Sequence, residues 1–353
     1  MTMPRGVALA ITPYNFPISS SLIALTASIA AGNCTLLRPS KSSPHCFSAL
    51  QRLINESFAP EHAFIIDSDH QEVQSLLLSD VDFFYFMGSR SEGLKLSALA
   101  AGAGVDFRIH LSGKCPVFID EANSSYLAVA VKRLLWAKTL NLGQSCTAPE
   151  ICFVPQQSLV EFRDRFSESV KEFYGNQPLT NPDLGRLRSK EDVIRLAELI
   201  APTKVLCGGE YSKKDRYFSP TLVTGLTQNM PIFQEEIFGP VLCLVPYTDK
   251  DEAFESFCQL SSQALAAYLF SNRPQTIQKL TESGRSTELV INDVMTQGTS
   301  ESAHVGGRGH FGFQTFSQSR FVFENTLQFE LPGRLPPYRR WMELASRRVL
   351  PWL

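Results

Sequence analysis

Residues 7–37 read VALAITPYNFPISSSLIALTASIAAGNCTLL. The run Val7–Thr12 is short and β-rich, and a proline stops it, which is typical of a buried strand before a turn. Ser19–Ala31 then reads as a helix of small and apolar residues that ends at a Gly-Asn pair, and Cys34–Leu37 is a second short apolar run. Strand, helix and strand in this order predict a βαβ unit and therefore a parallel sheet.

The same alternation continues outward to residue 111. Further strands are predicted at Ala63–Ile66, Phe83–Met87 and Phe107–Leu111, and helices at Ser43–Phe58, Gln71–Leu78 and Ser91–Ala101. Strands that alternate with helices of this length predict an open, doubly wound α/β sheet. Ligands bind such sheets at the carboxyl ends of the strands.

A second α/β region follows Lys114. Apolar residues recur at helical spacing over Ser125–Leu140, Glu150–Val154 reads as a strand and Leu159–Phe173 as a helix. The chain has 353 residues, and a prior of roughly 150 residues per domain favours more than one domain. We therefore expect a domain boundary near Lys114.

Composition excludes several classes of protein. The chain has 33 Lys and Arg against 35 Asp and Glu, a net charge of -2, so it has no general attraction for nucleic acid or an anionic membrane. Its eight cysteines form no C-x-x-C pair, so neither a metal site nor a disulfide scaffold is predicted, and a reducing compartment suits them. Residues 18–37 contain Ser and Thr, which favours a buried helix over a membrane span, and the N-terminus reads as a strand, not a signal peptide.

Two turns carry residues that could take part in a chemical reaction. Cys146 ends the run NLGQSC, where a thiolate could attack a carbonyl with amide donors nearby. Most lone cysteines are instead small buried hydrophobes. Asn15 lies in the loop PYNFP after the first strand, where two prolines either aim its amide at one point or form no more than a rigid turn.

Two further segments suit parts of a nucleotide. Gly88–Gly93, GSRSEG, follows a strand and opens a helix, so free amides there suit a phosphate. The segment lacks the G-x-G-x-x-G fingerprint and is equally compatible with a tight turn. Residues 234–240, QEEIFGP, offer a carboxylate that could bind a ribose diol, and the alternative is the end of a surface helix.

Together, in this order and at this spacing, these segments resemble the aldehyde dehydrogenase superfamily, and most of all its class 3 and fatty aldehyde dehydrogenases. The resemblance is carried by ITPYNFP at 11–17, WAKTLNLGQSCTAPE at 136–150, YFSPT at 217–221, FQEEIFGPVL at 233–242 and LPPY at 335–338. It implies an α/β fold of two Rossmann-related doubly wound domains with an extended C-terminal arm. The dinucleotide-binding domain would be 1–113, the catalytic domain 114–310, and the bridging arm with its basic tail 311–353.

The resemblance also implies a reaction, the oxidation of an aldehyde to a carboxylic acid with NAD or NADP. Cys146 would form a thiohemiacetal and then a thioester, the Asn15 amide would hold the oxyanion, and His110 stands at the position of the general base. Glu236 would bind the nicotinamide ribose. The residues expected at the cofactor are Thr12, Pro13, Arg38, Ser40, Lys41, Gly88, Ser89, Gly93, Glu236 and Phe238; no metal is expected.

The chain departs from the family at two of these positions. Residues 109–114 read IHLSGK where the family has L-E-L-G-G-K, so His110 replaces the carboxylate base. An ordinary pKa of about 6.5 leaves histidine mostly neutral at pH 7, so His110 or Glu236 could activate the water, or His110 could serve packing alone. Lys41 stands where the family often has a Glu. Together with Arg38 it could bind a 2′-phosphate; alternatively, both are solvated surface cations.

Three other departures concern larger segments. The first strand begins near residue 7, so either the sequence is truncated or the family's mostly helical N-terminal cover has been lost. Residues 305–312, VGGRGHFG, keep only part of a family glycine segment. Residues 334–353 combine arginines with tryptophans. That tail is too short to span a membrane but could lie on its surface, or pack on a partner subunit.

We expect a cytoplasmic homodimer that acts on a small-molecule aldehyde, binds no nucleic acid, and in one alternative contacts a membrane peripherally through the tail. A hypothesis of a different class is a non-catalytic relative that binds a dinucleotide or a protein partner. His110, Lys41 and the altered glycine segment favour it, whereas Cys146, Asn15 and Glu236 favour the enzyme.

Overall fold

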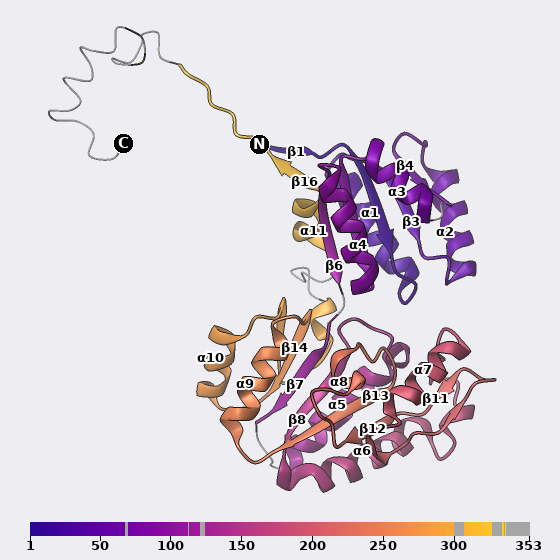
Figure 1. The fold of residues 1–353 in the computed structure, drawn as a ribbon, viewed down its shortest axis with the longest axis vertical. Helices are drawn as coiled ribbons and strands as arrows, with labels where there is room; N and C mark the ends of the chain where they lie inside the picture. The colour runs from indigo at the N-terminus through magenta and orange to yellow at the C-terminus, as the bar shows by residue number, and fades with distance from the viewer. Residues whose placement is uncertain are drawn as a thin grey trace, which may run out of the picture. The chain divides into compact units, whose positions relative to one another are not determined.

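The computed structural model describes residues 1–67, 70–111, 113–120, 124–299 and 307–326, together with 334 and 336. Two compact units are distinguished, one of Met3–Gln318 and the other of Met1 and Thr2 with the chain from Ser319 onward. In the smaller unit the Met1 ammonium donates to the Arg320 carbonyl at 3.2 Å, and the Arg320 amide donates to the Met1 carbonyl at 2.9 Å. The larger unit carries two large, separate β-sheets (Figure 1) and one two-stranded sheet.

The first sheet has five parallel strands in the order β4-β3-β2-β5-β6. Its strands are β2 (Val7–Thr12), β3 (Cys34–Pro39), β4 (Ala63–Ile65), β5 (Phe83–Gly88) and β6 (Asp106–Leu111), and its helices are α1 (Pro17–Ala30), α2 (Pro44–Ser57), α3 (His70–Ser79) and α4 (Arg90–Gly102). One apolar cluster joins the sheet to α1 and α2, and another joins it to α3 and α4. Helices therefore cover both faces, as the doubly wound prediction requires.

The second sheet has seven strands in the order β15-β14-β7-β8-β13-β12-β9, parallel except for β9. Its strands are β7 (Cys115–Ile119), β8 (Pro149–Pro155), β9 (Lys204–Cys207), β12 (Thr221–Thr224), β13 (Val241–Tyr247), β14 (Ala266–Phe270) and β15 (Glu288–Ile291). Its main helices are α5 (Ser124–Thr139), α6 (Leu159–Tyr174), α7 (Lys190–Ile200), α9 (Lys250–Ser261) and α10 (Pro274–Ser283). Apolar clusters pack α5 and α6 on one face and α7 and α9 on the other, so this sheet is also doubly wound.

Shorter elements complete the description. They are β1 (Thr2–Pro4), β10 (Tyr211–Ser212), β11 (Tyr217–Phe218), β16 (Ser317–Ser319), α8 (Pro231–Gln234), α11 (Gly309–Thr315), and the 3-10 turns η1 (Leu140–Gly143), η2 (Gln156–Ser158), η3 (Pro178–Thr180) and η4 (Thr296–Thr299). β10 and β11 form an antiparallel hairpin. Within the ranges that the structure describes, no helix is long and apolar enough to cross a membrane. Except for Arg334 and Pro336, the predicted basic tail lies outside those ranges.

The βαβ prediction for residues 7–37 is confirmed, with one shift. α1 begins at Pro17, two residues before the predicted Ser19, because proline is well suited to the first turn of a helix. The sequence prediction missed β7, a central strand whose five residues are all buried. Pro116 argues against a central strand, and the structure accommodates it at a register shift between Cys115 and Pro116 in the pairing with β8.

Candidate active site

A cavity of about 1270 Å³ opens at the carboxyl ends of the strands of the first sheet. Thr12, Gly88 and His110 lie at or next to the ends of β2, β5 and β6. Of the residues predicted for the site, the cavity is lined by Thr12, Pro13, Asn15, Arg38, Ser40, Lys41, Gly88, Ser89, His110, Cys146, Glu236 and Phe238. The folded chain thus brings Thr12 and Phe238, which are 226 residues apart in the sequence, to the same cavity.

The turn before Cys146 has an unusual backbone. Asn141, Leu142 and Gly143 all have positive φ, at 48°, 52° and 71°. At Gly143 a Cβ would lie only 2.3 Å from the Gly239 carbonyl oxygen, so no side chain fits there. This left-handed turn separates α5 from β8 and sets the direction in which the chain enters Cys146.

Three carbonyls around Cys146 are held from outside the turn. The Asn15 amide donates to the Gln144 carbonyl at 2.9 Å, the Cys115 thiol to the Cys146 carbonyl at 3.3 Å, and the Tyr268 hydroxyl to the Thr147 carbonyl at 2.5 Å. Because a trans peptide points its N–H opposite to its C=O, these bonds fix the direction of the amides as well. The turn is therefore a rigid support for a nucleophile.

Asn15 lies directly beside this turn. Its carbonyl accepts a hydrogen bond from the Asn141 side-chain amide at 2.8 Å, while its own amide nitrogen is bonded to Gln144. A side-chain amide has two N–H groups, so the bond to Gln144 orients the group without using up its donors. The position is compatible with an oxyanion donor.

The electrostatic surroundings of Cys146 disfavour its thiolate. Burial, and to a lesser extent the Glu236 carboxylate, raise the pKa of the Cys146 thiol to about 12, while the Cys146 backbone amide opposes both effects. A thiol with this pKa is protonated at neutral pH. Cys146 can act as a nucleophile only when a base or a cationic ligand changes these surroundings.

His110 lies at the end of β6 and is 8% exposed. Burial, aided by the charge of Arg108, lowers the pKa of the His110 imidazole to about 4. The ring is therefore neutral at pH 7 and able to accept a proton. It packs on the ring of Tyr85, with centroids 5.3 Å apart.

A buried ion pair supports the segment that carries Glu236. The Lys114 ammonium lies 2.8 Å from Glu150 Oε2, and both side chains are less than a tenth exposed. Glu150 Oε1 accepts hydrogen bonds from the amides of Ile237 and Phe238 at 2.7 and 3.3 Å. Sequence reasoning missed both partners of the pair, because their spacing of 36 residues gives no local signal.

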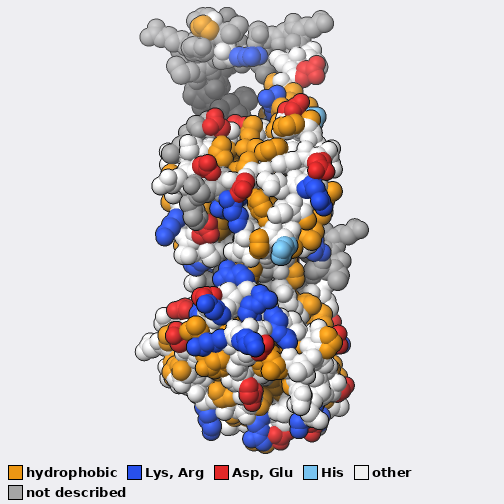
Figure 2. Space-filling view, turned by 90° about the vertical axis from the view of Figure 1, so that its right-hand side faces the viewer, with side chains coloured by type: hydrophobic (Ala, Val, Ile, Leu, Met, Phe, Trp, Pro, Cys, Tyr) orange, Lys and Arg blue, Asp and Glu red, His pale blue; other side chains and the backbone are white. Residues whose placement is uncertain are grey.

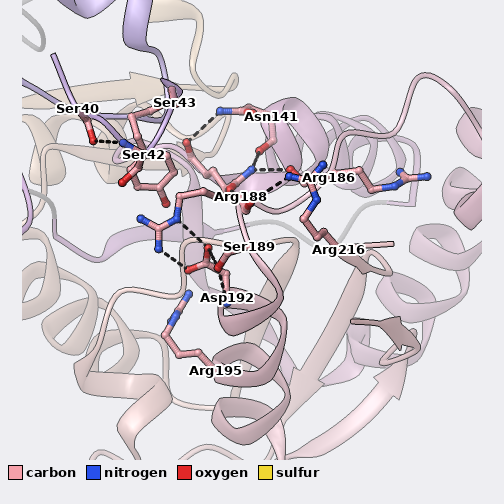
Figure 3. Close-up of polar contacts among 12 residues, drawn as sticks. Ser40, Ser42, Ser43, Asn141, Arg186, Arg188, Ser189, Asp192, Arg195 and Arg216 are labelled. Carbon is pink, nitrogen blue, oxygen red and sulfur yellow. Dashed lines mark hydrogen bonds and ion pairs between the residues drawn. The ribbon is translucent and has the colours of Figure 1, made fainter. Parts of the chain in front are cut away.

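A second wall of the cavity carries charges that the sequence analysis also missed. Arg188 binds Asp192 through two bonds of 3.1 Å (Figure 3). Its guanidinium lies 4.4 Å from the Tyr14 ring centroid. Arg195 donates to the Glu236 and Ile237 carbonyls at 3.3 and 2.6 Å. These residues belong to α7 and the loop before it, far from any recognisable motif.

The cavity wall is rich in cations. It includes Arg38, Lys41, Arg90, Lys114, Arg188 and Arg195. Lys41 forms an ion pair with Asp67. A group of Lys and Arg side chains is also visible on one face of the molecule (Figure 2). Cations near the start of a helix favour an anionic ligand.

The two glycines of the turn at residues 88–93 have different roles. Gly88 lines the cavity, and the Ser89 hydroxyl caps α4 by accepting from the Glu92 amide at 3.4 Å. Gly93 is buried and does not line the cavity; a Cβ there would lie 2.3 Å from Leu111 and 2.8 Å from Phe86. Its small size lets α4 approach β5 and β6.

These features define a class of site. A cavity at the carboxyl edge of a doubly wound sheet, with a bare glycine backbone, cations and a carboxylate, fits a dinucleotide. Cys146, on its rigid turn, lines the same cavity. Among the described residues, no cluster of three His, Cys, Asp or Glu could hold a metal ion. The fold and site are those of a dinucleotide-dependent oxidoreductase.

Comparison with known proteins gives the family. Residues 1–330 match the aldehyde dehydrogenase family, and the chain belongs to it. Its members oxidise aldehydes with NAD or NADP, and both the family and the fold support this reaction here. The resemblance to class 3 enzymes is confirmed by a mouse relative named aldehyde dehydrogenase family 3 member B2, which is 31% identical over 99% of this chain and 74% of its own length.

Two other matches are informative. The 4,4'-diapolycopene-4,4'-dial dehydrogenase of Cytobacillus firmus is 34% identical over 89% of this chain and 68% of its own length. A solved structure described as a substrate-bound state of Staphylococcus aureus AldH superposes with a TM-score of 0.88 at 29% identity, covering 98% of this chain and 77% of the other. The α/β fold is thereby confirmed.

Proposed function

We propose that Cys146 is the nucleophile of an aldehyde oxidation that passes through a thioester. The single observation that carries this proposal is the rigid turn, which presents Cys146 to the cavity while Asn15 lies beside it. The Cys146 sulfur adds to the aldehyde carbon, and the Asn15 amide with the Cys146 backbone amide stabilises the oxyanion. NAD or NADP, when bound, supplies the acceptor for the hydride.

We propose that His110 then serves as the general base. It is neutral at pH 7 and lines the same cavity as Cys146. A base with a pKa near 4 is weak at neutral pH, and Glu236 remains the alternative, because its charge reaches the Cys146 thiol. Steady-state rates of His110→Ala and Glu236→Gln separate the two, and wild-type turnover in both variants would contradict either assignment.

We propose that the cofactor lies along the cavity from Arg38, Ser40 and Lys41, past Gly88 and Ser89, to Glu236 and Phe238. All of these residues line it, as do Thr12 and Pro13. Gly93 would contribute by letting α4 approach the sheet. Arg38 and Lys41 are cations on one side of the cavity, which supports binding of a 2′-phosphate.

Calorimetric titration with NADP and NAD tests this cofactor preference. NADP is expected to bind at least as tightly as NAD. Lys41→Glu should reverse the order, because a carboxylate accepts from a ribose hydroxyl and repels a 2′-phosphate. A wild-type protein that clearly prefers NAD would overturn the proposal.

For the substrate we propose a medium or long aliphatic aldehyde. One relative is named for the dialdehyde 4,4'-diapolycopene-4,4'-dial, which supports an apolar aldehyde as the substrate here. A series of straight-chain aldehydes of increasing length, assayed at saturating cofactor, tests this. Rates that fall with chain length would contradict it.

The division of the chain is also a proposal. We place the dinucleotide-binding domain at 1–113, the catalytic domain at 114–310 and the arm at 311–353. In support, the first sheet ends with β6 at Leu111 and the second begins, in chain order, with β7 at Cys115.

We further propose a homodimer, tested by light scattering. Contact of the 334–353 tail with a membrane is tested by liposome co-sedimentation with and without the tail.

A second candidate function is a protein that binds the dinucleotide but does not turn over. The high pKa of Cys146 and the low pKa of His110 favour it. Intact-mass measurement after mixing with aldehyde and NAD or NADP, alongside NAD(P)H absorbance, separates the candidates. Sustained NAD(P)H production supports the enzyme, a single burst with an acyl group on Cys146 shows failed deacylation, and neither product supports the binding protein.

A further inference from the structure

Three segments of the chain meet at one edge of the cavity. They are the loop 13–16, the turn 141–146 and the loop 186–189 that leads into α7. Each contributes a residue to the lining of the cavity, namely Asn15, Cys146 and Arg188. Hydrogen bonds and one cation–ring contact join the three segments into a closed circuit, in which each segment contacts both of the others.

Gln144 joins the turn to the other two segments. It is 4% exposed, and its carbonyl accepts a hydrogen bond from the Asn15 side-chain amide at 2.9 Å. Its own side chain reaches the loop before α7, where Nε2 donates to the Arg186 carbonyl at 3.0 Å and Oε1 accepts from the Arg188 backbone N–H at 3.1 Å. The Asn15 side chain and the Arg188 backbone are therefore fixed to the same buried residue, two positions before Cys146.

The Arg188 side chain closes the circuit. Its guanidinium lies 4.4 Å from the centroid of the Tyr14 ring, within the range of a cation–π contact. Two bonds of 3.1 Å to the Asp192 carboxylate hold the guanidinium in place (Figure 3). Burial raises the pKa of the Tyr14 phenol to about 12, so the ring is uncharged near neutral pH. Arg188 therefore presents a fixed cation to a neutral aromatic face.

Tyr14 transmits this restraint to Asn15, its neighbour in the chain. The Tyr14 carbonyl, which belongs to the peptide bond with Asn15, accepts a hydrogen bond from the Ser43 hydroxyl at 3.0 Å. The Asn15 carbonyl accepts from the Asn141 side-chain amide at 2.8 Å. These two bonds hold the peptides on either side of Asn15. The contact of the Tyr14 ring with Arg188 is a third restraint on the same short segment.

We propose that Arg188 is a positioning residue that acts through Asn15. Its guanidinium packs on Tyr14 and keeps the neighbouring Asn15 amide directed at the carbonyl oxygen of the substrate. An amide that is free to turn away spends less time in the geometry that stabilises the oxyanion, so the addition of the Cys146 sulfur slows. The inference rests on the proposed roles of Cys146 and Asn15.

Acylation by p-nitrophenyl acetate tests the inference without any aldehyde or cofactor. The Cys146 sulfur displaces nitrophenolate from the ester, so the rate of the nitrophenolate burst measures the step in which the oxyanion forms. Arg188→Met removes the guanidinium but keeps the backbone N–H that bonds to Gln144. Its acylation rate is expected to fall about fivefold, as for the loss of one cation–π contact. The acetyl adduct should still appear in the intact mass after longer incubation.

Further variants separate positioning from a general loss of structure. Tyr14→Phe keeps the aromatic face and should retain the wild-type rate, whereas Tyr14→Leu should slow acylation as much as Arg188→Met. Lys190→Met is the matched control for charge, since the Lys190 side chain is 70% exposed and only two residues away, and it should acylate as wild type. Arg188→Met added to Asn15→Ala should cause no further loss, because no amide is left to be misdirected.

The outcomes separate this inference from the proposed function. Wild-type acylation in Arg188→Met overturns the role of Arg188 alone. A slowing that adds fully to that of Asn15→Ala also overturns it, because the two residues would then act independently. Wild-type acylation in Asn15→Ala overturns the proposed oxyanion donor, and this inference with it. A wild-type protein that forms no acetyl adduct on Cys146 overturns the proposed nucleophile and this inference together.

Discussion

At the scale of single residues, the surroundings of Cys146 oppose ionisation of its thiol. Glu236 raises the pKa of Cys146, whereas the neighbouring, exposed Glu235 does not contribute. Glu236→Gln should therefore lower that pKa and speed alkylation of Cys146 by iodoacetamide roughly threefold or more at pH 8. Peptide mass spectrometry of the alkylated Cys146 measures the rate. Glu235→Gln is the control and should leave it unchanged; equal rates in all three proteins would contradict the electrostatic coupling.

His110 should also make the stability of the fold depend on pH. Its pKa is about 4 in the folded protein and about 6.5 when unfolded, so the unfolded state binds the proton first as pH falls. The stabilisation is complete above pH 6.5 and is lost towards pH 4. At pH 5 the wild type should have lost about 2 kcal/mol relative to pH 7 from this residue.

Urea unfolding at the two pH values checks this expectation. His110→Gln should lose about 2 kcal/mol less than wild type between pH 7 and pH 5. His62 is exposed, and His62→Gln should keep the full wild-type loss. If His110→Gln and wild type lost the same free energy, the low pKa of His110 would be disproved.

At the scale of elements, α4 contains a position that requires glycine and another that does not. A Cβ at Gly93 would lie 2.3 Å from Leu111 and 2.8 Å from Phe86, whereas a Cβ at Gly102 meets nothing within 4 Å. Gly93→Ala should destabilise the protein by about 1–3 kcal/mol through overpacking. Gly102→Ala, in the same helix, should be neutral or stabilise it by up to about 1 kcal/mol. Urea denaturation of both variants decides, and an equally stable Gly93→Ala would refute the packing role.

At the scale of the whole molecule, the two sheets meet at the cavity through a few polar contacts. The Asn141 amide donates to the Asn15 carbonyl at 2.8 Å across 126 residues of chain. Asn141→Gly keeps a residue that tolerates positive φ but removes this bond. Loss of about 1 kcal/mol should weaken NAD or NADP binding about fivefold by calorimetry. Asn176→Gly, at an exposed loop position, should have no effect, and unchanged affinity in Asn141→Gly would contradict the link.

Some residues of the site could be predicted from local sequence patterns and others could not. Cys146, Asn15 and Glu236 could be singled out because each follows a strand or turn with a distinctive short sequence. Arg188, Asp192 and Glu150 could not, since a cation in a loop, or a carboxylate on a helix or in a strand, looks ordinary in sequence. Their importance comes from what they contact: the Tyr14 ring, the Arg188 guanidinium and the buried Lys114.

Apolar periodicity and turn residues predict the alternation of strands and helices, and with it the doubly wound sheets, because these signals act over a few positions. The order of several short motifs indicates the family. The central position of β7 despite Pro116, the packing role of Gly93 and the contact of Tyr85 with His110 are visible only in the folded chain. Such facts depend on burial and on distances between remote segments, and those exist only once the chain has folded.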